Sequence, residues 1–182
     1  FVLASIAARF IFPAVSLEGR TLWLLRASPM RMRDLLWAKF WVGTTPLLVL
    51  ALIIVGITGF LLQVPPFMFA VSLLTITGLT FAVCGLAIGF GTIFPQFETE
   101  NAAQIPTSFG GLLYMMSSVA VIGGVVILEA RPVAGYGAAR LYNVATSPGE
   151  MILWFSLAAA VCIAATVLPI REALRRLEKV ER

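Results

Sequence analysis

The stretch FWVGTTPLLVLALIIVGITGFLLQVPPFMFAVSLLTITGLTFAVCGLAIGFGTIFPQF, residues 40 to 97, contains no Asp, Glu, Lys or Arg. A helix needs about 20 apolar residues to traverse a hydrocarbon core of roughly 30 Å, so this stretch is long enough for two crossings. Gln63, Val64, Pro65 and Pro66 divide it near its middle, where proline would end a helix. The stretch therefore predicts a helical hairpin in a membrane.

The composition of the chain also indicates a membrane protein. Of its 182 residues, 60% are hydrophobic and 12% are charged, whereas soluble domains average about 25% charged residues. The sequence has no histidine, which is the commonest general base and metal ligand. Its two cysteines, Cys84 and Cys162, stand apart in apolar runs and are expected to be small buried hydrophobes. We therefore expect no metal, no cofactor and no nucleic acid partner.

We predict an all-α, polytopic membrane protein with four full spans and one partial span. The partial span covers residues 1–8, and the full spans cover residues 40–62, 67–94, 105–128 and 151–170. Residues 17–39 form a cytoplasmic segment, and residues 171–182 form a cytoplasmic tail. Because Phe1 is not Met and lies inside an apolar run, we expect the chain to be a piece of a longer polypeptide.

The basic residues predict the orientation, because Lys and Arg accumulate in the cytoplasmic connections of membrane proteins. One side receives Arg20, Arg26, Arg31, Arg33 and Lys39 before the first full span and Arg171, Arg175, Arg176, Lys179 and Arg182 after the last. The other side receives Arg131 and Arg140. Four crossings separate the two basic segments, so both can lie in the cytoplasm, which predicts a cytoplasmic carboxyl terminus.

The cytoplasmic segment 17–39 has the pattern of an amphipathic helix with a break. Ser28 followed by Pro29 is typical of a helix start, and after it Met32, Leu35, Leu36 and Phe40 share one helical face. We expect this segment to lie along the membrane surface. We also expect Arg9 at the cytoplasmic interface, with residues 10–17 lying along it.

Gly85 and Gly89 form a small-xxx-small pattern, which lets two membrane helices approach closely. Glycine is frequent in membrane helices, so this pattern favours packing within the chain over dimerisation. Gly110-Gly111 and Gly123-Gly124 have the same two interpretations.

The connection between the second and third full spans holds Glu98, Glu100 and Asn101. A pair of carboxylates can act in catalysis or hold a cation. A solvated turn, or a set of acceptors for basic residues of a partner protein, is the simpler interpretation, and we favour it.

Two further observations limit the classes of function that the chain can have. Neither Lys39 nor Lys179 follows a Gly-x4-Gly-Lys-Ser/Thr loop, and no Ser, Cys or Thr has a base at a recognisable spacing, so we expect the chain not to be an enzyme. No charged residue lies inside the predicted spans, which disfavours an ion-binding pocket and favours a hydrophobic or amphipathic cargo.

Two strings on the predicted cytoplasmic side resemble a known family. They are Phe12-Pro-Ala-Val-Ser-Leu-Glu-Gly-Arg20, continuing through Trp23-Leu-Leu-Arg-Ala-Ser-Pro29, and Phe94-Pro-Gln-Phe-Glu-Thr-Glu-Asn101, followed by Ala103-Gln-Ile105 and Ser108-Phe-Gly-Gly111. Both resemble the ABC exporter permeases of the ABC-2 type, which are membrane subunits of bacterial ABC transporters. The resemblance is to the carboxyl-terminal portion of such a permease.

The resemblance implies a permease that couples ATP hydrolysis by a separate cytoplasmic ABC ATPase to transport of a substrate across the bacterial plasma (inner) membrane. A coupling helix would lie in residues 17–39, and the permease would form a dimer. The residues then expected to contact the ATPase are Glu18, Gly19, Arg20, Trp23, Arg26, Glu98, Glu100 and Asn101. The alternative is a membrane scaffold or sensor that transports nothing and recruits a cytoplasmic partner through the same segment.

Overall fold

The structure of the chain is a computed structural model, which describes residues 1–14, 16, 32–95, 102–142 and 148–181. These residues form five α-helices and two short 3-10 helices, and no strand occurs among them. In chain order the elements are α1 (Val2–Phe10), η1 (Phe12–Ala14), α3 (Met32–Leu61), α4 (Pro66–Ile93), η3 (Ala102–Thr107), α5 (Phe109–Tyr142) and α6 (Pro148–Glu181).

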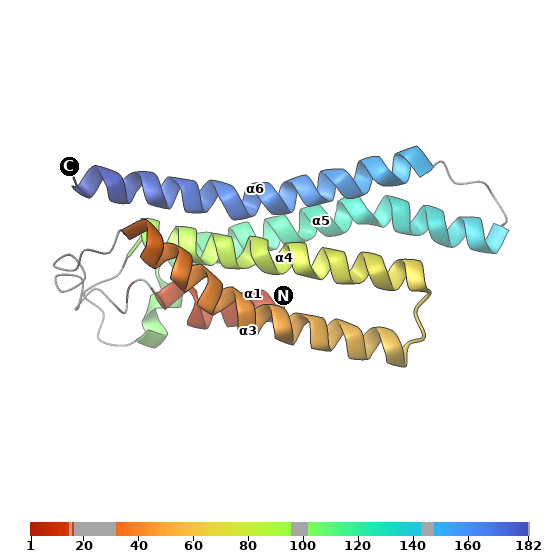
Figure 1. The fold of residues 1–182 in the computed structure, drawn as a ribbon, viewed down its shortest axis with the longest axis horizontal. Helices are drawn as coiled ribbons and strands as arrows, with labels where there is room; N and C mark the ends of the chain where they lie inside the picture. Colours follow the sequence, from red (N-terminus) through yellow and green to blue (C-terminus); the bar gives the residue numbers. More distant parts are fainter. Residues whose placement is uncertain (15, 17–31, 96–101, 143–147, 182) are drawn as a thin grey trace.

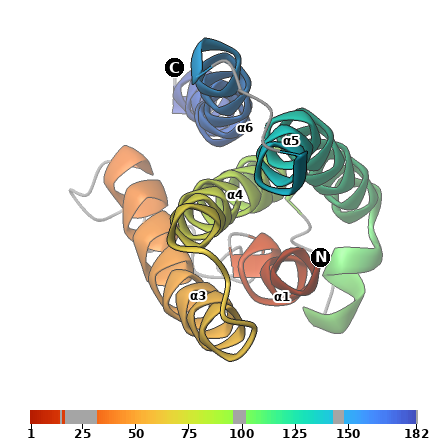
Figure 2. The same cartoon turned by 90° about the vertical axis from the view of Figure 1, so that its right-hand side faces the viewer.

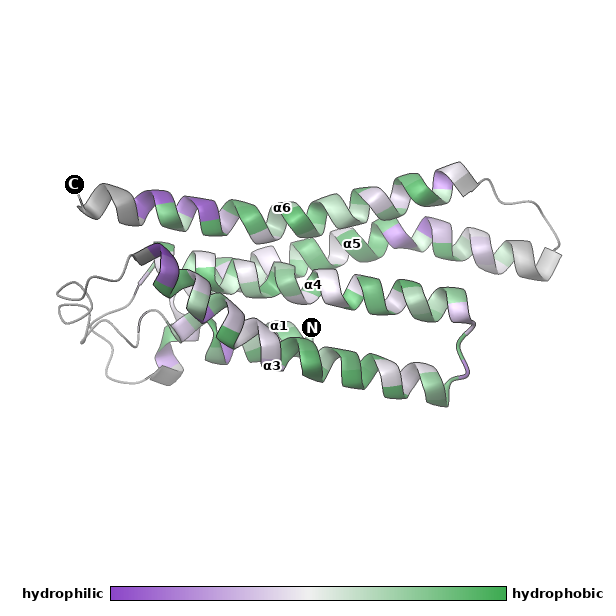
Figure 3. Cartoon of the chain, in the orientation of Figure 1, coloured by the Kyte–Doolittle hydropathy of each residue, from purple (hydrophilic) through white to green (hydrophobic). Residues whose placement is uncertain are grey.

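The four long helices lie side by side as an elongated bundle (Figure 1). Successive helices run in opposite directions, so α4 and α6 are parallel to each other. Each of the four contains a stretch that is long and apolar enough to cross a membrane, and the apolar residues form a band along the bundle (Figure 3). The predicted fold class, all-α with four full spans, is confirmed.

The turn between α3 and α4 lies at the predicted division, and its hydrogen bonds show how α3 ends. Gln63 has a φ of 49°, the left-handed conformation that commonly follows the last residue of a helix. The Val64 N–H donates to the Gly59 carbonyl over 3.1 Å, and the Gln63 N–H donates to the Phe60 carbonyl over 3.2 Å. This is a Schellman motif, and Pro66 then begins α4 at a position where proline needs no N–H partner.

Three helices depart from the predicted limits, and one of them is α6, which runs from Pro148 to Glu181 and so extends past residue 170. Helix α3 begins at Met32 and continues without a break to Leu61, so residues 32–39 are its first turns and form no separate helix. Helix α5 begins at Phe109, after η3, and continues beyond Leu128 to Tyr142. It continues through Pro132, because membrane helices tolerate an internal proline when neighbouring groups satisfy the backbone.

Helix α4 occupies the centre of the bundle, with α1, α3, α5 and α6 arranged around it (Figure 2). Its largest interface is with α6, and glycine makes this interface possible. A methyl group in place of the Gly85 hydrogen would lie 2.8 Å from Cα of Thr166. At Gly89 it would lie 2.3 Å from Cβ of Pro169. The two predicted packing glycines therefore contact α6 of the same chain.

We predict that Gly89→Ala lowers the stability of the folded protein by about 1–3 kcal/mol, because the added methyl group has no space against Pro169. Unfolding in detergent, followed by circular dichroism, measures the change. Gly123→Ala is the matched control, since nothing lies within 4 Å of the added methyl group there and alanine favours a helix. Equal stability of the two variants would contradict the α4–α6 contact.

Candidate functional site

The residues predicted to contact an ATPase lie outside the described part of the chain. Glu18, Gly19, Arg20, Trp23 and Arg26 fall within residues 17–31, and Glu98, Glu100 and Asn101 fall within residues 96–101. Their roles remain predictions. The structure does describe the elements on either side of both segments.

These flanking elements meet at one end of the bundle. Element η1 precedes residues 17–31, η3 follows residues 96–101, and the two 3-10 helices pack against each other. The ammonium group of Lys39, in the second turn of α3, donates a hydrogen bond of 2.6 Å to the carbonyl of Ala14. The same end carries the start of α3, the end of α4 and the carboxyl end of α6 (Figure 1).

A buried aromatic cluster holds η1 in place. The ring of Phe12 is fully buried, with its centroid 5.9 Å from that of Tyr114 in α5. The Tyr114 hydroxyl donates to the carbonyl of Ala4 in α1 over 3.0 Å. Gly91 of α4 faces the carbonyl oxygen of Phe12, which a methyl group there would approach to 2.5 Å.

This packing corrects, for Ile11, Phe12 and Pro13, the expectation that residues 10–17 lie along the membrane surface. Ile11, Phe12 and Pro13 are buried in the described core, whereas Arg9 and Phe10 are exposed. The physical reason is the space that Gly91 and Gly110 leave between α4 and α5, into which Phe12 fits.

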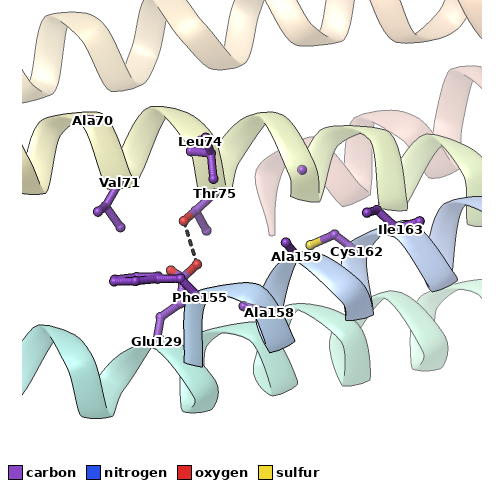
Figure 4. Close-up of a pocket in the computed structure, with 11 residues that line it drawn as sticks. Ala70, Val71, Leu74, Thr75, Glu129, Phe155, Ala158, Ala159, Cys162 and Ile163 are labelled. Atoms are coloured by element: carbon purple, nitrogen blue, oxygen red, sulfur yellow. Dashed lines mark hydrogen bonds between the residues drawn. The ribbon is translucent and has the colours of Figure 1, made fainter. Parts of the chain in front are cut away.

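The second site lies on the side of the bundle, where α4, α5 and α6 meet, and was not predicted. Glu129 of α5 accepts a hydrogen bond of 2.7 Å from the hydroxyl of Thr75 in α4. Both residues line a cavity of about 440 Å³ between α4, α5 and α6 (Figure 4). Its other lining residues are almost all apolar: Ala70, Val71, Leu74, Gly78, Phe155, Ala158, Ala159, Cys162 and Ile163.

Glu129 lies one residue beyond the predicted span 105–128, in a helix that continues past it. It falls within the membrane-length stretch Phe109–Ala138, and a hydrophilic stretch interrupts the apolar band of α5 (Figure 3). A charged residue ends an apolar run in the sequence, but it does not end a helix.

Arg131 does not neutralise Glu129. Residues two positions apart on a helix do not face each other, and the Arg131 guanidinium lies 5.3 Å from the ring centroid of Trp154. Among the described residues, no Lys or Arg side chain forms an ion pair with Glu129.

The described residues contain no cluster of His, Cys, Asp and Glu side chains that could hold a metal ion. Cys84 and Cys162 are both free and buried. A second, larger groove of about 760 Å³ lies between α1 and α3, with Lys39 among its mostly apolar lining residues.

The fold defines the class, a multi-pass, all-α membrane protein in which Glu129 of α5 is hydrogen-bonded to Thr75 of α4. Residues 1–182 match a family described as "Putative ATP-binding cassette", and the chain belongs to this family. The match shows a relation to ABC transporters. Its description names the ATP-binding part of such systems, so it does not show the permease assignment made from the sequence. No curated protein and no solved structure matches the chain.

Proposed function

We propose that this chain is the membrane-spanning permease subunit of an ATP-driven ABC exporter. It couples ATP hydrolysis by a separate ATPase subunit to translocation of the substrate. The observation that carries the proposal is the combination of the family match with four apolar helices of membrane length. An ATP-binding domain needs a phosphate-binding loop, and the sequence contains no Gly-x4-Gly-Lys-Ser/Thr. ATP binding is therefore assigned to a partner, and this chain is not itself an enzyme.

The packing at one end of the bundle supports a coupling surface there. Residues 17–31 and 96–101 carry all the predicted contact residues, and the elements that flank them, η1 and η3, pack together. Lys39 ties the start of α3 to η1. A movement imposed on either segment by an ATPase would therefore reach α3, α4 and α5 through buried contacts, Phe12 against Tyr114 among them.

The arrangement of charge supports a cytoplasmic location for this end, and the family resemblance implies a bacterial plasma (inner) membrane. Arg171, Arg175 and Arg176 lie in the last third of α6, which ends there. A dimer of permease units follows from the family resemblance, and it would use a face other than Gly85 and Gly89, because α6 covers those glycines.

We predict that the protein co-purifies in detergent with the ABC ATPase encoded beside its gene, and that Glu18→Lys or Arg20→Glu releases the ATPase. A reversed charge would face the partner's complementary groups and repel them. Affinity purification followed by quantitative blotting measures the retained ATPase.

Glu150→Lys is the matched control, since Glu150 is an exposed carboxylate in the first turn of α6, at the opposite end of the bundle. It should retain the ATPase. If the wild-type protein retains no ATPase, the permease proposal fails and the scaffold becomes the better account. If Glu150→Lys releases as much ATPase as Glu18→Lys, the proposed surface is wrong.

We also predict that green fluorescent protein fused after Arg182 is fluorescent in bacterial cells, because it folds in the cytoplasm. Alkaline phosphatase inserted after Gln63 should be active, because that turn would face the periplasm. Inactive phosphatase at Gln63, together with a dark carboxyl-terminal fusion that is present on a blot, would reverse the proposed orientation.

A further inference from the structure

We propose that the cavity between α4, α5 and α6 binds a lipophilic organic cation, with Glu129 as its counter-ion. The ligand class is a compact apolar body that carries one positive charge, such as a tertiary or quaternary ammonium or a phosphonium.

The unpaired carboxylate is the first argument. Ionisable side chains within membrane spans are costly, and they usually pair with an opposite charge or line a functional path. Glu129 has no cationic partner among the described residues, because Arg131 lies over Trp154. A cation in the cavity would supply the missing charge.

The hydrogen bonding of Glu129 leaves room for such a ligand. The Thr75 hydroxyl donates to Oε1 and holds the carboxylate toward α4. Oε2 has no hydrogen-bond partner within the described part of the chain. Figure 4 shows Glu129 reaching from α5 toward Thr75, in the part of the cavity that Phe155 also lines.

The residues that line the cavity suit an apolar ligand that carries one positive charge. Apart from Thr75 and Glu129, the cavity is lined by aliphatic side chains, Gly78, Cys162 and the ring of Phe155. An aromatic face attracts a cation, and a volume of about 440 Å³ lies in the usual range of small-molecule sites. A bare metal ion would find too few oxygen ligands here, because Ca²⁺ takes 6–8 of them.

The cavity lies at membrane depth and opens toward the lipid. Helix α4 has 28 residues and is about 42 Å long, and Thr75 lies about 14 Å along it from Pro66. A hydrocarbon core of roughly 30 Å centred on α4 would therefore contain Thr75. Leu74 and Ile163 line the cavity and remain 69% and 63% exposed, so a lipophilic ion can enter from the bilayer.

A role of the cation as transported cargo rests on the proposed function of the chain as a permease. Binding of the cation in the cavity does not depend on that function. The test therefore uses the full chain alone, without any ATPase, in nanodiscs of phosphatidylcholine. The probe is radiolabelled tetraphenylphosphonium in equilibrium dialysis, with empty nanodiscs as background. Tetraphenylborate, which has nearly the same shape and the opposite charge, is the control ligand.

We expect saturable binding of tetraphenylphosphonium, and at least tenfold weaker binding by Glu129→Gln. Ala159→Trp should weaken binding as much while keeping the carboxylate, because the indole would fill the cavity. Glu150→Gln, an exposed carboxylate outside the cavity, should bind like the wild type. Circular dichroism checks that each variant is folded, and if Glu129→Gln is not, Ala159→Trp and Thr75→Val decide the question.

Three results would overturn the assignment. They are no saturable binding by the wild type, equal binding of tetraphenylborate, or unchanged affinity in the folded cavity variants. Since no ATPase is present, these outcomes say nothing about coupling. If the protein binds tetraphenylphosphonium but does not associate with an ATPase, the ligand site is supported and the transport role is contradicted.

Discussion

The close approach of α4 and α6 at Gly85 and Gly89 is the contact on which the rest of the bundle depends. In hydrocarbon no hydrophobic force drives helices together, so association relies on close packing and on polar contacts. Thr166 and Pro169 of α6 pack directly onto the backbone of α4 at these glycines. This contact holds α6 along α4, and the basic end of α6 lies at the end of the bundle where α4 stops.

The same contact creates the cavity around Glu129. With α6 held against α4 on one side, and α5 packed on both helices, the three helices line an open cavity whose small residues are Ala70, Gly78, Ala158 and Ala159. Thr75, Glu129 and Phe155 each come from a different helix. The bundle thus has two candidate regions, the carboxylate site around Glu129 and the packed end that is proposed to receive a partner, and α4 extends to both.

The sequence was sufficient to predict features that depend on composition and on residues that end a helix. The uncharged residues 40–97 and the Gln63–Pro66 break predicted the α3–α4 hairpin that the structure contains. It was insufficient where tertiary packing decides. Phe12 lies in the core because glycines on α4 and α5 make room for it. Glu129 was missed because the predicted span ended one residue before it, although the helix continues to Tyr142.

A disulfide cross-link between Gly78→Cys and the native Cys162, in a Cys84→Ala background, tests the α4–α6 contact most directly. A Cβ at position 78 would lie 3.5 Å from Cβ of Cys162, which suits a disulfide. After oxidation in membranes, both thiols of the Gly78→Cys protein should be protected from a polyethylene-glycol maleimide, and the chain should remain monomeric on a non-reducing gel. The thiol of the Gly123→Cys control should still react with the maleimide. Unprotected thiols in the Gly78→Cys protein, or cross-linked dimers only, would contradict the arrangement.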